Sequence, residues 1–137
     1  MPPSVDSNAA GEDQRPGQSL AIGAEALYLV NLLLVPGLAF LALLFLYWRY
    51  IGTAPPLAQC HLRQVVAASL WAGVLLVLAN AVIILVGGYD SPYTWMVAVI
   101  YFTIFHTTLV LLGTVGLAKA MAGQNYRYPL IGRPCDN

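Results

Sequence analysis

Residues 65–86, VVAASLWAGVLLVLANAVIILV, decide the fold. This stretch has no charged side chain, and at 1.5 Å of rise per helical residue it is long enough to cross ~30 Å of bilayer hydrocarbon. Two further runs, about 26–48 and 93–118, share this character. Backbone amides in hydrocarbon must be paired within the segment, and these runs lack the alternation of barrel strands. The sequence therefore predicts an all-α membrane protein with three transmembrane helices.

The composition excludes several other classes of protein. Hydrophobic residues make up 59% of the 137 residues, whereas charged residues make up only 9% and leave no net charge. A soluble domain carries about 25% charged residues, and a disordered chain is poor in apolar ones. Nucleic-acid binding would require a basic patch, which a chain with six Lys and Arg against six Asp and Glu does not offer. The lipid bilayer is the expected partner, and nucleic acid is not.

The chain divides into a membrane domain and two tails. Residues 1–24 are rich in Pro, Gly and small polar residues, without hydrophobic periodicity, and are predicted to be a flexible tail. Their acidic, prolyl start does not fit a secretory signal, so we expect this tail to stay on the protein. Residues 25–121 hold the three helices, and residues 122–137 form the C-terminal tail.

Basic residues predict the orientation. Two of them, Arg49 and Arg63, lie in the first loop, and three others follow the third run, namely Lys119, Arg127 and Arg133. Only Arg15 precedes the first run. Since Lys and Arg concentrate in cytoplasmic segments, the C-terminus is predicted to be cytoplasmic and the N-terminus to be outside.

His106 is the most informative polar residue within the runs because it lies near the middle of the third one. A haem or metal ligand is one interpretation, but a bis-His haem site needs a second histidine at the same depth. The other histidine, His61, precedes the second run and is about 20 Å away along the membrane normal. We therefore expect His106 to be structural.

Asn31 and Asn80 lie at similar depths from the outer ends of their helices and could meet in an interhelical hydrogen bond.

Small residues four apart predict close helix packing. Three such pairs occur, two in the second run and one in the third, and Pro36-Gly37 is expected to kink the first helix. The predicted packing or partner contacts are Asn31, Ala68, Ser69, Ala72, Gly73, Asn80, His106, Gly116 and Ala120.

No residue pattern indicates catalysis, a cofactor or a metal. Cys60, His61 and Cys135 lack the paired spacing of a zinc site. A disulfide between the two cysteines is not expected, because both are placed on the reducing cytoplasmic side. Nothing resembles a nucleophile–base pair or a phosphate-binding loop. We therefore expect no enzyme activity.

The C-terminal half carries a resemblance to a known family. Residues 106–130 read HTTLVLLGTVGLAKAMAGQNYRYPL, and a His-x-Arg entry at His61 and Arg63 precedes the second run. From about Cys60 onward the chain resembles a family of small bacterial membrane proteins of unknown function that is distantly related to the chloroplast inner-envelope translocon channel component. The resemblance implies a multi-pass protein of the bacterial inner (cytoplasmic) membrane.

The end of the third run suits a membrane surface. Lys119 and Arg127 place cations near anionic headgroups and a helix C-terminus, and Tyr126 and Tyr128 are predicted interfacial anchors. The leading functional hypothesis is a non-catalytic accessory or assembly subunit of a larger inner-membrane complex, with other integral membrane subunits as partners. One alternative is a translocation or channel component. A more distant one is a haem-bearing electron-transfer subunit.

Overall fold

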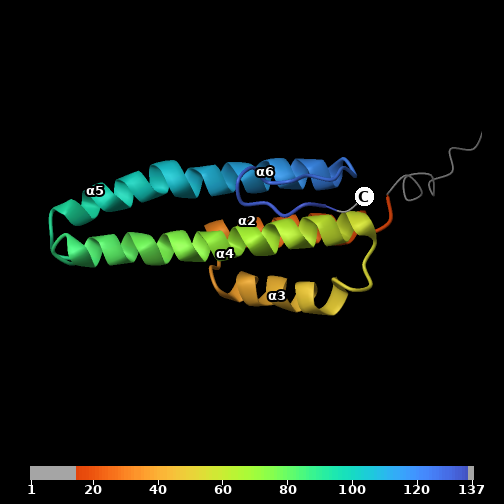
Figure 1. Cartoon of the computed structure of the whole chain (residues 1–137), viewed down its shortest axis with the longest axis horizontal. Coiled ribbons are helices and arrows are strands. Elements are labelled where there is room, and N and C mark those ends of the chain that lie inside the picture. Colours follow the sequence, from red (N-terminus) through yellow and green to blue (C-terminus); the bar gives the residue numbers. More distant parts are fainter. Residues whose placement is uncertain (1–14, 136–137) are drawn as a thin grey trace, which may run out of the picture.

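The computed structural model describes residues 15–135 and is all-helical over that range (Figure 1). The elements are α2 (Gln18–Leu33), α3 (Leu38–Tyr50), α4 (Pro56–Leu85), α5 (Tyr93–Ile100), the π-helical segment η1 (Tyr101–His106) and α6 (Thr107–Met121). Because α5, η1 and α6 follow one another without a break, they form a single rod beside α4. The all-α prediction is confirmed.

Proline and glycine set the limits of the two long helices. Pro56 stands at the first position of α4, where its missing N–H costs nothing. At the other end Gly87 and Gly88 adopt positive φ angles of 123° and 80°, which L side chains rarely adopt. The turn at 86–92 then leads into α5, and we call it the far turn.

The first apolar run is a helical hairpin, not the single membrane-crossing helix predicted for 26–48. The chain stops being helical after Leu33, turns at Pro36 and Gly37, and runs back as α3 along α4 (Figure 1). Gly37 has a φ of 90°, and its amide donates to the Asn31 side chain at 3.1 Å. The expected kink is therefore a full reversal, which a glycine with positive φ permits.

This reversal brings the two ends of the described chain together. The Arg15 guanidinium donates a hydrogen bond to the Gly123 carbonyl at 2.8 Å. The side-chain amide of Gln18 donates to the Met121 carbonyl at 2.7 Å. The prediction that the N-terminal and C-terminal segments lie at opposite ends of the helices is therefore wrong for the described residues, because the first run turns back on itself. The same reversal returns Arg49 to this end.

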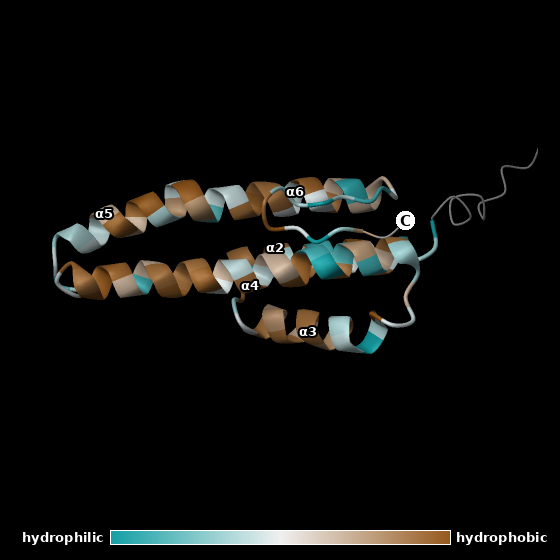
Figure 2. Cartoon of the chain, in the orientation of Figure 1, coloured by the Kyte–Doolittle hydropathy of each residue, from teal (hydrophilic) through white to brown (hydrophobic). Residues whose placement is uncertain are grey.

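All six Lys and Arg residues of the chain consequently lie at one end, which we call the polar end: Arg15, Arg49, Arg63, Lys119, Arg127 and Arg133. Figure 2 shows hydrophilic segments gathered there and hydrophobic helix toward the far turn. Of the two acidic residues in the described range, Glu25 belongs to the polar half and Asp90 to the far turn.

The predicted tails are shorter and more ordered than expected. Helix α2 begins at Gln18, so residues 18–24 are helical, while 1–14 lie outside the described residues. Residues 122–135 fold back on the bundle, and Tyr128 is only 1% exposed. Residues 136–137 also lie outside the described range.

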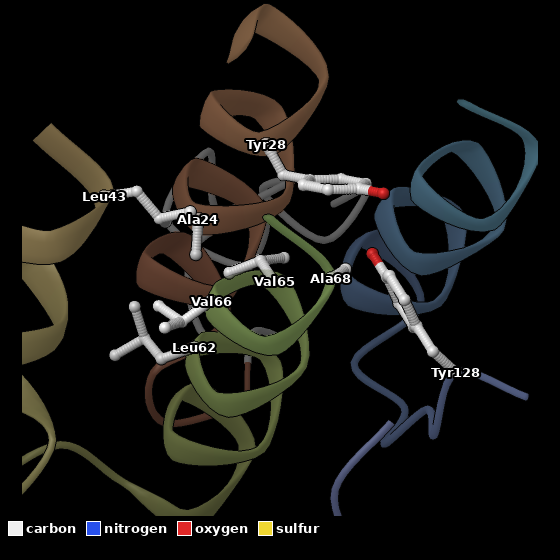
Figure 3. Packing of buried hydrophobic residues seen from close by; sticks show 8 residues of the cluster. All are labelled: Ala24, Tyr28, Leu43, Leu62, Val65, Val66, Ala68 and Tyr128. Carbon is white, nitrogen blue, oxygen red and sulfur yellow. The ribbon is translucent and has the colours of Figure 1, made fainter. Parts of the chain in front are cut away.

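The hydrophobic core lies in the polar half, where α2 contacts α3, α4 and α6. Figure 3 shows eight of its members: Ala24, Tyr28, Leu43, Leu62, Val65, Val66, Ala68 and Tyr128. Beyond the α2–α3 turn the two long helices continue alone, with Val77 68%, Leu85 83% and Trp95 77% exposed. Both α4 and the rod Tyr93–Met121 are long and apolar enough to cross a membrane.

Candidate functional site

A buried carboxylate lies at the centre of the polar half. Glu25 projects from α2 with no exposed surface, and its Oε1 atom lies 2.6 Å from Nδ1 of His61 in α4. Its second oxygen, Oε2, accepts a hydrogen bond from the hydroxyl of Tyr128 in the C-terminal segment. We call these three residues the clamp, because they join two helices and the segment after α6. Such a buried charge is tolerated only when it is paired and hydrogen-bonded.

One proton is shared between Glu25 and His61. Nε2 of His61 lies 2.9 Å from the Gln124 carbonyl, which can only accept, so this nitrogen carries a hydrogen. The clamp therefore exists either as an imidazolium with a carboxylate or as a neutral imidazole with a carboxylic acid. Burial raises the pKa of Glu25 above its ordinary value, although hydrogen bonds from His61 and Tyr128 oppose the rise. Burial also raises the pKa of Tyr128, which keeps its phenol protonated as a donor.

Gln64, one helical turn after His61, holds the backbone of the C-terminal segment. Its Oε1 accepts from the amides of Tyr128 at 3.3 Å and Arg133 at 3.1 Å, and its Nε2 donates to the Arg133 carbonyl. A disulfide between Cys60 and Cys135 closes the segment against α4, with Cα atoms 5.0 Å apart. The expectation of two unpaired cysteines is therefore wrong, because the segment folds back along α4 instead of leaving the bundle.

Glycines in α6 provide the space for this arrangement. A Cβ atom at Gly116 would lie 2.5 Å from Oε2 of Glu25 and 2.7 Å from the Tyr128 hydroxyl. One turn earlier, a Cβ at Gly113 would lie 2.6 Å from the ring of Tyr28. The side chains of Glu25, Tyr28 and Tyr128 can therefore pack this closely on α6 only because the two positions they contact are glycines.

A second site lies where the α2–α3 hairpin turns. A partly open cavity of about 360 Å³ separates that turn from α4 and η1. Its lining includes Phe40, Ser69, Gly73, Tyr101 and His106. The clamp and the cavity therefore use different residues.

A comparison with protein-family models identifies the relatives of this fold. Residues 18–134, from the first residue of α2 through almost all of the segment held by the clamp, match the model for MamF and MmsF, described as the magnetosome magnetite crystal formation protein family. The chain belongs to this family. No curated protein and no solved structure matches it.

Membership in the family supports one part of the earlier resemblance. The expectation of a small bacterial membrane protein family is met, but nothing in the match supports a relationship to the chloroplast translocon channel component. The family is linked by its description to magnetite crystal formation, and the match covers the clamp and the cavity alike.

The structure distributes the predicted packing residues over several places. Ala68, Ser69 and Ala72 are buried on α4, and Ala120 is buried against Ala21 and Leu57. Gly73 is exposed, and a Cβ atom there would meet nothing within 4 Å. The close helix contact predicted for the Ser69/Gly73 pair therefore does not form within the chain.

The predicted meeting of the two asparagines does not occur. Asn31 accepts from Gly37 within the hairpin, whereas Asn80 accepts from the hydroxyl of Tyr89 in the far turn at 2.5 Å. The reason is the reversal of the first run, which ends α2 before it reaches the level of Asn80.

His106 lines the cavity and packs edge-on against the Phe102 ring, with 5.3 Å between the ring centroids.

Of the four predicted interfacial anchors, Tyr128 is placed differently from the prediction. It is buried as a member of the clamp, whereas Arg127 is exposed, Tyr126 is half-buried and Lys119 donates to Gln124 at 3.1 Å.

The sequence analysis did not identify Glu25, His61 and Gln64 as one group. One signal was available: Glu25 adjoins an apolar run and is the only acidic residue between positions 14 and 89.

Proposed function

We propose that this chain is a non-catalytic accessory protein of magnetite crystal formation, held in a bacterial inner membrane by α4 and the α5–η1–α6 rod. The observation that carries the proposal is the family match over residues 18–134, which includes every helix that the structure describes between residues 15 and 135. The exposed apolar surface of the two long helices supports a membrane setting, because soluble proteins rarely expose contiguous apolar patches of that size.

The polar end is cytoplasmic in this proposal, and the far turn lies on the opposite side. The support is the distribution of all six Lys and Arg residues at one end, since positive charge is retained in the cytoplasm. Helices α2 and α3 have 16 and 13 residues, or ~24 Å and ~20 Å, and each is too short for ~30 Å of hydrocarbon. The hairpin therefore enters from the cytoplasmic side and returns to it.

The clamp serves a structural purpose in this role. Both oxygens of Glu25, both nitrogens of His61 and the hydroxyl of Tyr128 are engaged with protein groups, so none is left to act on a substrate. The clamp fixes the C-terminal segment in one shape at the membrane surface, with Arg127 and Arg133 exposed. These cations suit anionic lipid headgroups or the surface of another integral subunit.

Deleting the gene and restoring it in variants tests the proposal. We expect the deletion to change the size or shape of the magnetite crystals in electron micrographs, and the wild-type chain to restore them. Gly116→Leu, which collides with Glu25 and Tyr128, should restore them poorly, whereas Gly23→Ala, which meets open space on α2, should restore them fully. Unchanged crystals in the deletion strain would refute the crystal-formation role.

The accessory-subunit part has its own measurement. Blue-native electrophoresis of gently solubilised membranes, followed by mass spectrometry, should show the chain migrating with other integral membrane proteins. Migration of the chain by itself at its own mass would contradict that part and leave the crystal role standing.

A further inference from the structure

The lining of the cavity under the α2–α3 turn includes polar side chains that make no hydrogen bond within the described residues. Ser69 is 5% exposed, and its hydroxyl has no hydrogen-bond partner in the structure. Within the described residues, His106 makes a ring contact with Phe102 but no hydrogen bond through either ring nitrogen. An unpaired buried polar group costs about 1–3 kcal/mol, so the Ser69 hydroxyl favours a partner that enters the cavity. The half-buried His106 ring lines the same cavity and can supply a second hydrogen bond to that partner.

The π-helical segment places ring-bearing residues around this space. Tyr101, Phe102 and His106 all belong to η1, and all three line the cavity together with Phe40 of α3. Thr107 stabilises the widened turn by donating to the Phe102 carbonyl at 2.9 Å. Single π-helical turns occur often at functional sites, because the extra residue redirects side chains. The widened turn is thus a second sign, independent of Ser69, that the cavity is a binding site.

The depth of the cavity restricts the chemistry of its ligand. Ser69 and Gly73 lie in the apolar part of α4, and the hairpin turns at their level. In the membrane placement proposed above, on which this inference rests, Ser69 lies about 9 Å and Gly73 about 15 Å beyond Arg63 toward the far turn, within the hydrocarbon layer. The ligand must therefore be a lipid-soluble molecule that carries hydrogen-bond acceptors into the hydrocarbon interior.

We propose that the cavity binds the headgroup of an isoprenoid quinone. Its planar ring packs against Phe40, Tyr101 and Phe102, and its carbonyl oxygens accept hydrogen bonds from the Ser69 hydroxyl and the His106 imidazole. The hydrocarbon tail leaves through the open side of the cavity into the lipid. Pockets for small molecules commonly combine such an apolar aromatic lining with a few polar groups that fix orientation. A phospholipid acyl chain would fill the volume but satisfy neither polar group.

Labelling with a photoreactive azidoquinone tests this proposal on the purified full-length chain in nanodiscs of phosphatidylcholine and phosphatidylglycerol. We expect saturable labelling of residues 69–76 or 101–106, located by mass spectrometry and competed by decylubiquinone. An excess of oleic acid should not compete. Equal competition by oleic acid would show an acyl-chain site and overturn the proposal, and so would labelling that rises linearly or spreads over the lipid-facing surface.

Three variants of the cavity lining and one control variant sharpen the result. Gly73→Leu fills the cavity without moving the backbone, because a Cβ atom at Gly73 meets nothing within 4 Å, and it should reduce labelling at least tenfold. Ser69→Ala and His106→Phe each remove one donor and should weaken competition by decylubiquinone about fivefold. Val77→Leu, at an exposed position outside the cavity lining, should have no effect. Unchanged competition by decylubiquinone in Ser69→Ala and His106→Phe would refute the proposed hydrogen bonds even if Gly73→Leu did not fold. Binding is measured on purified protein, so its failure is separate from any result on crystal shape.

Discussion

The carboxylate of Glu25 lies 2.6 Å from the imidazole of His61, and the same carboxylate accepts from Tyr128, 103 residues further along the chain. These contacts connect the first described helix, the longest helix and the C-terminal segment through one buried group. Each member of the clamp is the hydrogen-bond partner of another member. Removing one side chain therefore leaves a buried polar atom without a partner, and the resulting loss of folding stability measures the contribution of the clamp.

Tyr128→Phe should destabilise the folded protein by about 1–3 kcal/mol, because Oε2 of Glu25 loses its donor while it stays buried. The measurement is the free energy of unfolding in detergent with increasing denaturant. Tyr126→Phe is the matched control, since Tyr126 is half-buried in the same segment and is not a member of the clamp. A similar loss in both variants would mean that the Glu25 contact contributes little.

The pH dependence of stability should report Glu25. Burial raises the pKa of its carboxyl in the folded state, so the folded protein holds a proton that the unfolded chain has released. The contribution to stability is therefore fully present below the unfolded pKa, about 4.3, and is lost as the pH rises through the folded pKa. Wild-type protein minus Glu25→Gln should show a stability difference that declines as the pH rises from 4. A difference that grows with pH would contradict the raised pKa.

Breaking the disulfide should free the C-terminal segment. The bond joins residues 75 positions apart, and the chain-entropy model gives such a cross-link about 4 kcal/mol. Reductant should therefore lower the stability of the wild-type protein and speed tryptic cleavage after Arg127, which is exposed. Cys60→Ser should behave like the reduced protein and show no response to reductant.

The proposed orientation makes a further prediction about these cysteines. Cystines on the cytoplasmic side are usually transient or regulatory, so rapid alkylation in intact cells should find mostly free thiols. A fluorescent protein fused after Asn137 should be fluorescent, and alkaline phosphatase inserted in the far turn should be active. Active phosphatase after Asn137, together with fully oxidised cysteines, would reverse the orientation.

Two glycines should respond oppositely to alanine. Gly116→Ala places a methyl group 2.5 Å from Glu25, and we expect it to cost about 1–3 kcal/mol of stability. Gly73→Ala places the methyl in open space within a helix, where alanine exceeds glycine in helix propensity by about 1 kcal/mol, so stability should hold or rise. Thermal unfolding of both variants provides the measurement. Equal losses of thermal stability in the two variants would mean that α2 and α6 are packed less closely at Gly116 than the structure shows.

The apolar run at 65–86 determined by itself that this part of the chain is a helix, and Gly87-Gly88 determined where it ends. Both features act locally, through burial of apolar side chains and through backbone angles, so they are visible in a stretch of neighbouring residues. The all-α class and the membrane character followed for the same reason.

Tertiary structure alone decided how the first run is used. Pro36-Gly37 interrupts a helix whether the chain kinks or reverses, and that choice depends on whether α3 packs against α4 or continues across the bilayer. The choice then decided the clamp. Glu25, His61 and Tyr128 are far apart in sequence, and their pairing depends on α2, α4 and the returning segment meeting at one level, which no local pattern encodes.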